Sequence, residues 1–92
     1  MLKTFKHKGL SELWETGKSG KIDAKLQKRV LVRLDAMHKA KVLGSLAIVG
    51  FNFHPLNGFD PMRYSIHVNG PWCLTFEFNE TDVEAVDFEQ YH

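Results

Sequence analysis

Two alternating runs, YSIHV at residues 64–68 and WCLTF at residues 72–76, flank a turn of Asn69-Gly70-Pro71. Alternation of apolar and polar residues is typical of half-buried strands, and Asn-Gly is a frequent start of a hairpin turn. A three-residue turn sets apolar residues opposite one another: Val68 with Trp72, Ile66 with Leu74 and Tyr64 with Phe76. A two-residue turn would mix apolar and polar partners on each face. Because burial sets register strongly, the pattern predicts the three-residue turn.

The other face of this hairpin is predicted to be polar and to point away from the core. Its expected pairs, with Cβ atoms about 5 Å apart, are His67 with Cys73, Ser65 with Thr75 and Arg63 with Glu77. The next strand, residues 83–88, fits best in a register that places Asp87 beside Cys73. In that register Val86 lies near Leu74, and Phe88 lies near Trp72. Gln90, Tyr91 and His92 are then expected to trail off the sheet near this polar surface.

Upstream of the hairpin the pattern predicts a short strand over residues 2–5 and two helices. The first helix is expected to end near Gly17, and the second to begin after a capping Asp23 and to end near Lys41. One apolar stripe on the second helix is formed by Leu26, Val30, Leu34 and Met37, while Lys25, Lys28, Arg29 and Arg33 lie largely off it. Residues 46–50 could be a strand or a helical turn, and residues 51–61, with two prolines and a glycine, read as a long loop.

These elements predict an α+β fold in which two N-terminal helices pack on a small, mainly antiparallel sheet. The chain has 92 residues and 43% apolar content, enough for one core, so we expect a single domain over residues 1–92. Its tryptophans and phenylalanines are interpreted as core residues. One cysteine cannot form an internal disulfide, and the apolar runs are too short to span a bilayer. A cytoplasmic protein with no membrane partner is the expectation.

Charge divides the chain into a basic half and an acidic half. Residues 1–42 hold eleven Lys/Arg against four Asp/Glu, a balance of +7, and residues 43–92 hold Arg63 against seven Asp/Glu, a balance of −6. The basic half is suited to a polyanion such as RNA, although a solvated lysine-rich helix explains it equally well. The candidate RNA- or ribosome-binding residues are Lys6, Lys8, Lys18, Lys21, Lys25, Lys28 and Arg29.

The order of strand, helix, helix, loop and three strands resembles the RelE superfamily of bacterial toxins, and the residues resemble its HigB branch more closely. The likeness is carried by four stretches that span nearly the whole chain. They are residues 1–10 (MLKTFKHKGL), 54–58 (HPLNG), the hairpin segments SIHVN at 65–69 and WCLTF at 72–76, and the closing Tyr91-His92.

The resemblance implies a toxin of a type II toxin–antitoxin system that enters the ribosomal A site and cuts mRNA. It also implies a small helix-turn-helix antitoxin of the HigA kind, through which alone the toxin would meet DNA. His54, Tyr91 and His92 match positions tied to catalysis in the family, and Gln90 stands where an acidic residue is usual. Three positions where basic residues are frequent are occupied here by Asn57, His67 and Cys73.

Metal-free RNA cleavage by the 2′-hydroxyl needs a base, an acid and positive charge on the transition state. His54 and His92 could divide the first two tasks, because the pKa of histidine lies near neutrality, with Tyr91 as a proton donor or stacking surface. A protonated His67 or Arg63 could supply part of the charge. The missing arginine at Cys73 is expected to cost about 3–4 kcal/mol, or roughly 10²–10³ in rate.

Two functions therefore stay open. One is a ribosome-dependent mRNA endonuclease, and the other is a weakened domain that acts mainly as an antitoxin- or ribosome-binding module. Structural interpretations of single residues stay open too: His54 as a backbone-binding loop residue, His67 as a polar strand residue and the terminal pair as a frayed tail. No metal or cofactor is expected, because His54, His67, Cys73 and His92 lack the spacing of a zinc site.

Overall fold

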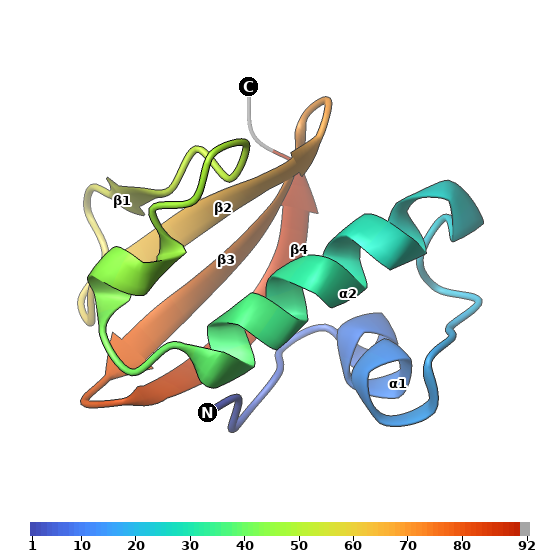
Figure 1. The fold of residues 1–92 in the computed structure, drawn as a ribbon, viewed down its shortest axis with the longest axis horizontal. Helices are drawn as coiled ribbons and strands as arrows, with labels where there is room; N and C mark the ends of the chain where they lie inside the picture. Colours follow the sequence, from blue (N-terminus) through green and yellow to red (C-terminus); the bar gives the residue numbers. More distant parts are fainter. Residues whose placement is uncertain (91–92) are drawn as a thin grey trace.

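The computed structural model describes residues 1–90, and within them the chain forms two helices, a 3-10 turn and a four-stranded antiparallel sheet (Figure 1). The elements in chain order are α1 (Lys8–Thr16), α2 (Ala24–Lys39), η1 (Leu43–Leu46), β1 (His54–Leu56), β2 (Arg63–Asn69), β3 (Trp72–Asn79) and β4 (Asp82–Gln90). The sheet order is β1-β2-β3-β4, so each strand pairs with its neighbour in the sequence. This arrangement confirms the predicted α+β architecture.

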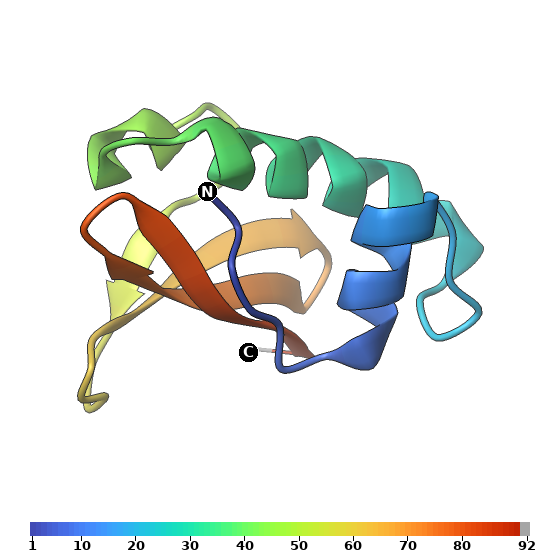
Figure 2. The same cartoon turned by 90° about the horizontal axis from the view of Figure 1, so that it is seen from below.

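Two layers make up the molecule (Figure 2). Helix α2 lies across one face of the sheet, and α1 packs beside it against α2 and β4. The core between them contains the whole predicted stripe of α2 together with the apolar face of β2 and β3. No helix of residues 1–90 covers the opposite face in either view, and none of them is long and apolar enough to cross a membrane.

Helix α1 ends and helix α2 begins at the residues that the sequence indicated, whereas α2 ends at Lys39, two residues before the expected Lys41. Helix α1 stops at Gly17, whose left-handed backbone (φ 87°) lets its N–H reach the carbonyl of Leu13. The Asp23 side chain caps α2 by accepting a hydrogen bond from the Lys25 N–H at 3.0 Å. One expectation for α2 was wrong, because Arg33 is buried at 9% exposure instead of lying on the solvent side.

The predicted register of the hairpin is confirmed from Arg63↔Glu77 to His67↔Cys73. It fails at the turn, where Asn69 instead of Val68 lies opposite Trp72. A bulge between residues 67 and 69 accounts for the difference, because it keeps Val68 in the core while the chain turns tightly through Gly70, whose φ is +56°.

The predicted register of β4 was wrong by two residues. Leu74 pairs with Phe88 and Thr75 with Asp87, so Glu89 lies opposite Cys73. A second bulge explains the shift: Ala85 adopts a left-handed backbone (φ 51°), and the pairing slips between Thr75 and Glu77. The extra residue allows both Val83 and Val86, which are three positions apart, to face the core.

The remaining elements differ from expectation in three places. Residues 2–5 make isolated parallel bridges to β4 at Val83 and Val86 and no full strand. The ambiguous segment over residues 46–50 forms neither element: the 3-10 turn η1 ends at Leu46, and residues 47–50 contain no helix and no strand. The expected loop over residues 51–61 contains β1, whose Pro55 is tolerated because β1 is an edge strand.

Candidate functional site

Cross-strand pairing gathers the chemistry-bearing residues on the helix-free face of the sheet. His54 pairs with Ser65, Ser65 with Thr75, and Thr75 with Asp87, so one polar row crosses all four strands. Rows on either side contain Arg63 with Glu77, and His67 with Cys73 and Glu89. We call this surface the polar face, and its residues are His54, Arg63, Ser65, His67, Cys73, Thr75, Glu77, Asp87 and Glu89.

His54 lies exposed at the start of β1, with its ring orientation fixed. Its Nδ1 is 2.8 Å from the backbone carbonyl oxygen of Asn52, whose left-handed backbone (φ 47°) accompanies this contact. Because a carbonyl only accepts, Nδ1 must bear the hydrogen. In the neutral ring the lone pair is therefore on Nε2, the nitrogen that is free to take up a proton.

Arg63 is the arginine of the polar face, two residues before Ser65 on β2. It is buried at 6% exposure. Its Nη1 contacts Oε2 of Glu77 at 3.2 Å, and its Nη2 donates to Oγ1 of Thr75 at 3.1 Å and to the carbonyl of Ala85 at 2.8 Å. These contacts hold the guanidinium within the sheet surface. Its charge is balanced by Glu77 in this structure.

One acidic residue neighbours Cys73, although it is not the one expected. Glu89 replaces the predicted Asp87 as its neighbour on β4, and Glu89 also accepts a short hydrogen bond from the Thr75 hydroxyl. The Cys73 thiol was expected to be partly exposed but is buried at 8%. The position where the family resemblance led us to expect an arginine is thus a small buried thiol beside a carboxylate.

His67 is fixed through both its backbone and its side chain. Its N–H donates to the carbonyl of Phe51 at 2.6 Å, its own carbonyl accepts from Nε of Arg33 at 2.7 Å, and its Nε2 lies 3.0 Å from the carbonyl of Gly70. The ring is half-buried. Because a carbonyl only accepts, Nε2 bears the hydrogen in this contact, and the lone pair of the neutral ring is on Nδ1.

Arg33 is a residue that sequence reasoning missed. Its guanidinium packs over the Phe51 ring, 4.7 Å from the centroid, and burial lowers its pKa, with a smaller contribution from nearby Arg29. Within residues 1–90 it forms no ion pair with a carboxylate. A signal was present, because position 33 lies three residues after the buried Val30 on the same helix.

The end of β4 is held by an aromatic stack on the core side. Trp72 stacks on Phe88 with ring centroids 4.6 Å apart, and His7 meets the Phe88 ring edge-on at 6.0 Å. Gln90 was expected to trail off the sheet, but it is the last residue of β4 and pairs with Trp72. The candidate residues Tyr91 and His92 lie outside the described residues.

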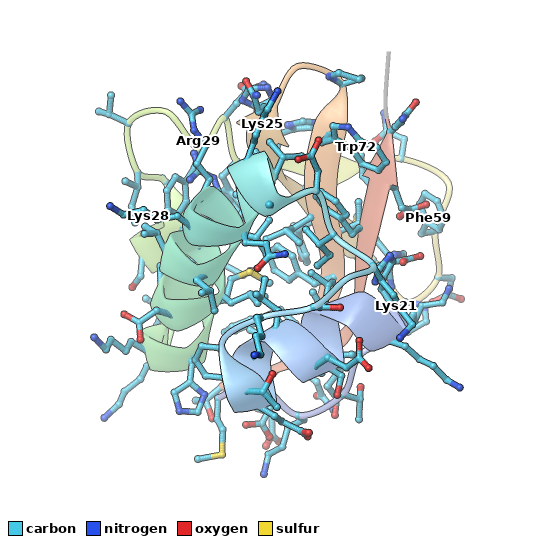
Figure 3. All side chains as sticks on the ribbon, turned by 90° about the vertical axis from the view of Figure 1, so that its right-hand side faces the viewer. Lys21, Lys25, Lys28, Arg29, Phe59 and Trp72 are labelled. Carbon is cyan, nitrogen blue, oxygen red and sulfur yellow. The ribbon has the colours of Figure 1, made fainter. Side chains whose placement is uncertain are left out.

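The candidate RNA-binding cations are all exposed, but they do not border the polar face as one group. Figure 3 shows Lys25, Lys28 and Arg29 together at one end of α2, and α2 covers the opposite face of the sheet. Lys21 lies apart from them, paired with Glu12 at 3.0 Å. Lys18 lies in the loop after α1, three residues before Lys21, and Lys6 and Lys8 flank the start of α1. Asn57 is exposed directly after β1.

In the part of the chain that the structure describes, no three His, Cys, Asp or Glu side chains gather closely enough to hold a metal ion.

Comparison with known proteins matches residues 3–92 to the family of RelE-like toxins of the type II toxin–antitoxin system HigB. A relative from Proteus vulgaris, named Endoribonuclease HigB, is 37% identical over 92 residues, which is the full length of both chains. The resemblance seen in the sequence is thereby confirmed, and a toxin of such a system has an antitoxin as its partner. The chain belongs to the RelE-like toxins of the HigB type II toxin–antitoxin system.

Proposed function

We propose that this toxin is an endoribonuclease that cuts mRNA on the ribosome, with the polar face as its substrate surface. Membership of the toxin family and the name of the Proteus vulgaris relative support the activity. The observation that carries the proposal for this chain is the contact between His54 Nδ1 and the Asn52 carbonyl. It leaves an exposed imidazole nitrogen next to a sheet face that contains a second imidazole, that of His67.

In the proposed reaction His54 Nε2 accepts the proton of the attacking 2′-hydroxyl. The oxygen then bonds to the phosphorus, and the 5′-oxygen leaves with a proton from the second acid, for which His92 is the proposed residue. Tyr91 and Gln90 complete the proposed catalytic set, with Tyr91 as a proton donor or a stacking surface. A positioned base or acid of this kind contributes roughly 10²–10⁴ in rate.

Positive charge is the weak part of this proposed site. Asn57, His67 and Arg63 are the proposed transition-state and substrate contacts, and Arg63 is already engaged by Glu77, Thr75 and a backbone carbonyl. Glu89 beside Cys73 makes the local field less favourable for an anionic substrate. These contacts favour a second candidate function, a catalytically weak toxin that acts mainly by binding its antitoxin or the ribosome.

Binding to the ribosome is assigned in this proposal to the exposed cations Lys6, Lys8, Lys18, Lys21, Lys25, Lys28 and Arg29. Because those on α2 and the polar face lie on opposite sides of the sheet, the helix can contact ribosomal RNA while the other face meets the message. The proposed location is the cytoplasm. The proposed antitoxin is a small helix-turn-helix protein, and DNA is contacted only through the toxin–antitoxin complex.

A translation reaction reconstituted from purified components, with mRNA ends mapped by primer extension, tests the main proposal. The unchanged protein is expected to produce cuts within translated codons that disappear when ribosomes are omitted. His54→Ala is expected to lower the cleavage rate by roughly 10²–10⁴, and His92→Ala by a similar factor.

Lys39→Ala, which changes an exposed cation on α2 outside the proposed set, is the control. Cleavage by His54→Ala at the unchanged rate would remove His54 from the mechanism, and absence of cleavage by the unchanged protein would favour the binding-module function.

A further inference from the structure

The loop over residues 57–62 leaves the sheet at one edge of the polar face. It joins Leu56 of β1 to Arg63 of β2, two residues that pair directly. In Figure 2 this loop projects from the sheet on the side away from α2. Figure 3 likewise places Phe59 and Lys28 on opposite sides of the sheet. The loop therefore lies at the edge of the proposed substrate surface, on the side of the sheet away from α2.

Phe59 on this loop is an exposed aromatic residue, in contrast to the expectation that every phenylalanine is in the core. Its exposure is 44%, whereas the other six phenylalanines are buried or half-buried. It takes no part in the ring contacts that link aromatic side chains elsewhere in residues 1–90. Gly58, with φ +86°, turns the chain directly before it. The ring is thus available to a ligand.

The position of Phe59 relative to His54 suits a contact with RNA. They are five positions apart in the sequence, so their Cα atoms are at most roughly 18 Å apart. A single exposed apolar residue on an arbitrary surface needs no explanation. Here, however, the ring stands beside a face whose paired residues include two histidines and the buried Ser65 and Thr75 but no aromatic side chain.

The composition of the loop distinguishes contact with a base from contact with a phosphate. Residues 57–62 contain no cation, and Asp60 next to Phe59 repels phosphate oxygens. An exposed aromatic ring instead stacks on the flat face of a nucleobase, and this contact tolerates any base identity. Asn57 at the base of the loop adds an amide that can donate and accept hydrogen bonds.

We propose that Phe59 is a stacking platform for a nucleobase that flanks the phosphodiester bond to be cut. This inference rests on the proposed function, because it takes the polar face as the surface that binds mRNA. It adds a subsite that holds the message by its base at the edge of the sheet. Such a subsite compensates in part for the shortage of cations that would otherwise hold the RNA backbone.

Fluorescence anisotropy with a labelled, short single-stranded RNA tests this subsite. The RNA has 2′-O-methyl riboses, so it cannot be cut, and the protein is the full chain at low ionic strength. Phe59→Ala is expected to weaken binding by roughly one to two orders of magnitude, and Phe59→Leu by part of that factor. Phe59→Trp is expected to bind at least as tightly as the unchanged protein. Val32→Ala, at an exposed aliphatic residue of α2, is the matched control.

Oligonucleotides with one abasic site identify the contacted base. The unchanged protein should bind the RNA that lacks this base more weakly than the intact RNA. Phe59→Ala should bind the two RNAs with equal affinity, because it already lacks the ring that contacts the base. In this binding assay the inference would be overturned by the absence of saturable binding by the unchanged protein, by equal affinity of Phe59→Ala, or by full affinity of Phe59→Leu. If Phe59→Ala binds RNA normally but loses the antitoxin, the ring belongs to the antitoxin interface instead. Cleavage that depends on His54 but not on Phe59 would refute this subsite alone, whereas Phe59-dependent binding without cleavage would refute only the nuclease.

Discussion

Nη2 of Arg63 donates a buried hydrogen bond to Oγ1 of Thr75 at 3.1 Å, across the pair of strands at the centre of the polar face. Thr75 in turn donates to the Glu89 carboxylate on the next strand. Arg63, Thr75 and Glu89 therefore form one connected network that crosses three strands. The arginine nearest to the proposed chemistry stabilises the sheet in this arrangement, and an RNA phosphate would have to compete with these partners for it.

This network predicts that Arg63→Gln destabilises the fold. Removing the guanidinium leaves Glu77 partly buried without its cation, and Thr75 without a donor, so we expect a loss of about 3 kcal/mol in the free energy of unfolding. Urea denaturation of Arg63→Gln and of the unchanged protein measures this loss. Lys39→Gln is the control, because its ion pair with Asp35 is exposed and contributes only about 0.3–0.5 kcal/mol. If Arg63→Gln keeps full stability but loses cleavage, Arg63 acts on the substrate.

Gly9 is predicted to resist substitution because of a close approach at the start of α1. A Cβ atom there would lie 2.8 Å from Cε1 of His7 and 2.9 Å from Cβ of Lys21. The His7 side chain caps α1, so displacing it also removes a helix cap. We expect Gly9→Ala to lower stability by about 1–3 kcal/mol, which thermal unfolding would report as a clearly lower Tm. Gly20→Ala meets open space and should leave the Tm almost unchanged.

The lowered pKa of Glu12 predicts one part of the loss of fold stability at acidic pH. Its hydrogen bond from Ser19, and then that from Lys21, hold the pKa below its ordinary value of 4.5. A lowered folded-state pKa stabilises the fold above pH 4.5, and this contribution is lost as the pH falls through the folded-state value. The difference in Tm between the unchanged protein and Glu12→Gln should therefore be positive at pH 7 and shrink below pH 4.5. Glu15→Gln on the same helix is the control, and a pH-independent difference would contradict the assignment.

The central hairpin was predictable because only one register buries all of its apolar residues. The pairs from Arg63↔Glu77 to His67↔Cys73 follow from that single requirement. The same requirement could not set the register of β4, because a shift of two residues leaves each side chain on its own face. The deciding feature is the bulge at Ala85, and nothing in the sequence marks an alanine for a left-handed backbone.

The candidate site was predictable where the family resemblance supplied it and much less so elsewhere. His54 was identified by its match to the family. Its strand, β1, was predicted to be a loop because proline and glycine, here Pro55 and Gly58, are typical of loops. The contact between Arg33 and His67 joins residues 34 positions apart, and no local pattern encodes such a pairing. Exposure of Phe59 likewise depends on how the loop leaves the sheet.

Cys73 offers the most direct test of whether this toxin is limited by its charge. It lies on the polar face between His67 on β2 and Glu89 on β4, where no helix covers the sheet, so a longer side chain there can reach beyond the buried position of the thiol. Restoring a cation at a preorganised position typically gains roughly 10²–10³ in rate. Because Glu89 would compete for the new guanidinium, the gain at this position is expected toward the lower end.

We therefore predict that Cys73→Arg raises the rate of mRNA cleavage by about 10² and increases growth arrest when it is expressed. The physical reason is that positive charge beside His67 stabilises the pentavalent phosphate, which the thiol and the Glu89 carboxylate cannot do. Cys73→Gln is the matched control, since it adds length and hydrogen bonding without charge and should leave the rate within a few-fold. Equal rates for Cys73→Arg and Cys73→Gln, measured as initial cleavage rates in the reconstituted translation reaction, would show that the missing cation does not limit this toxin.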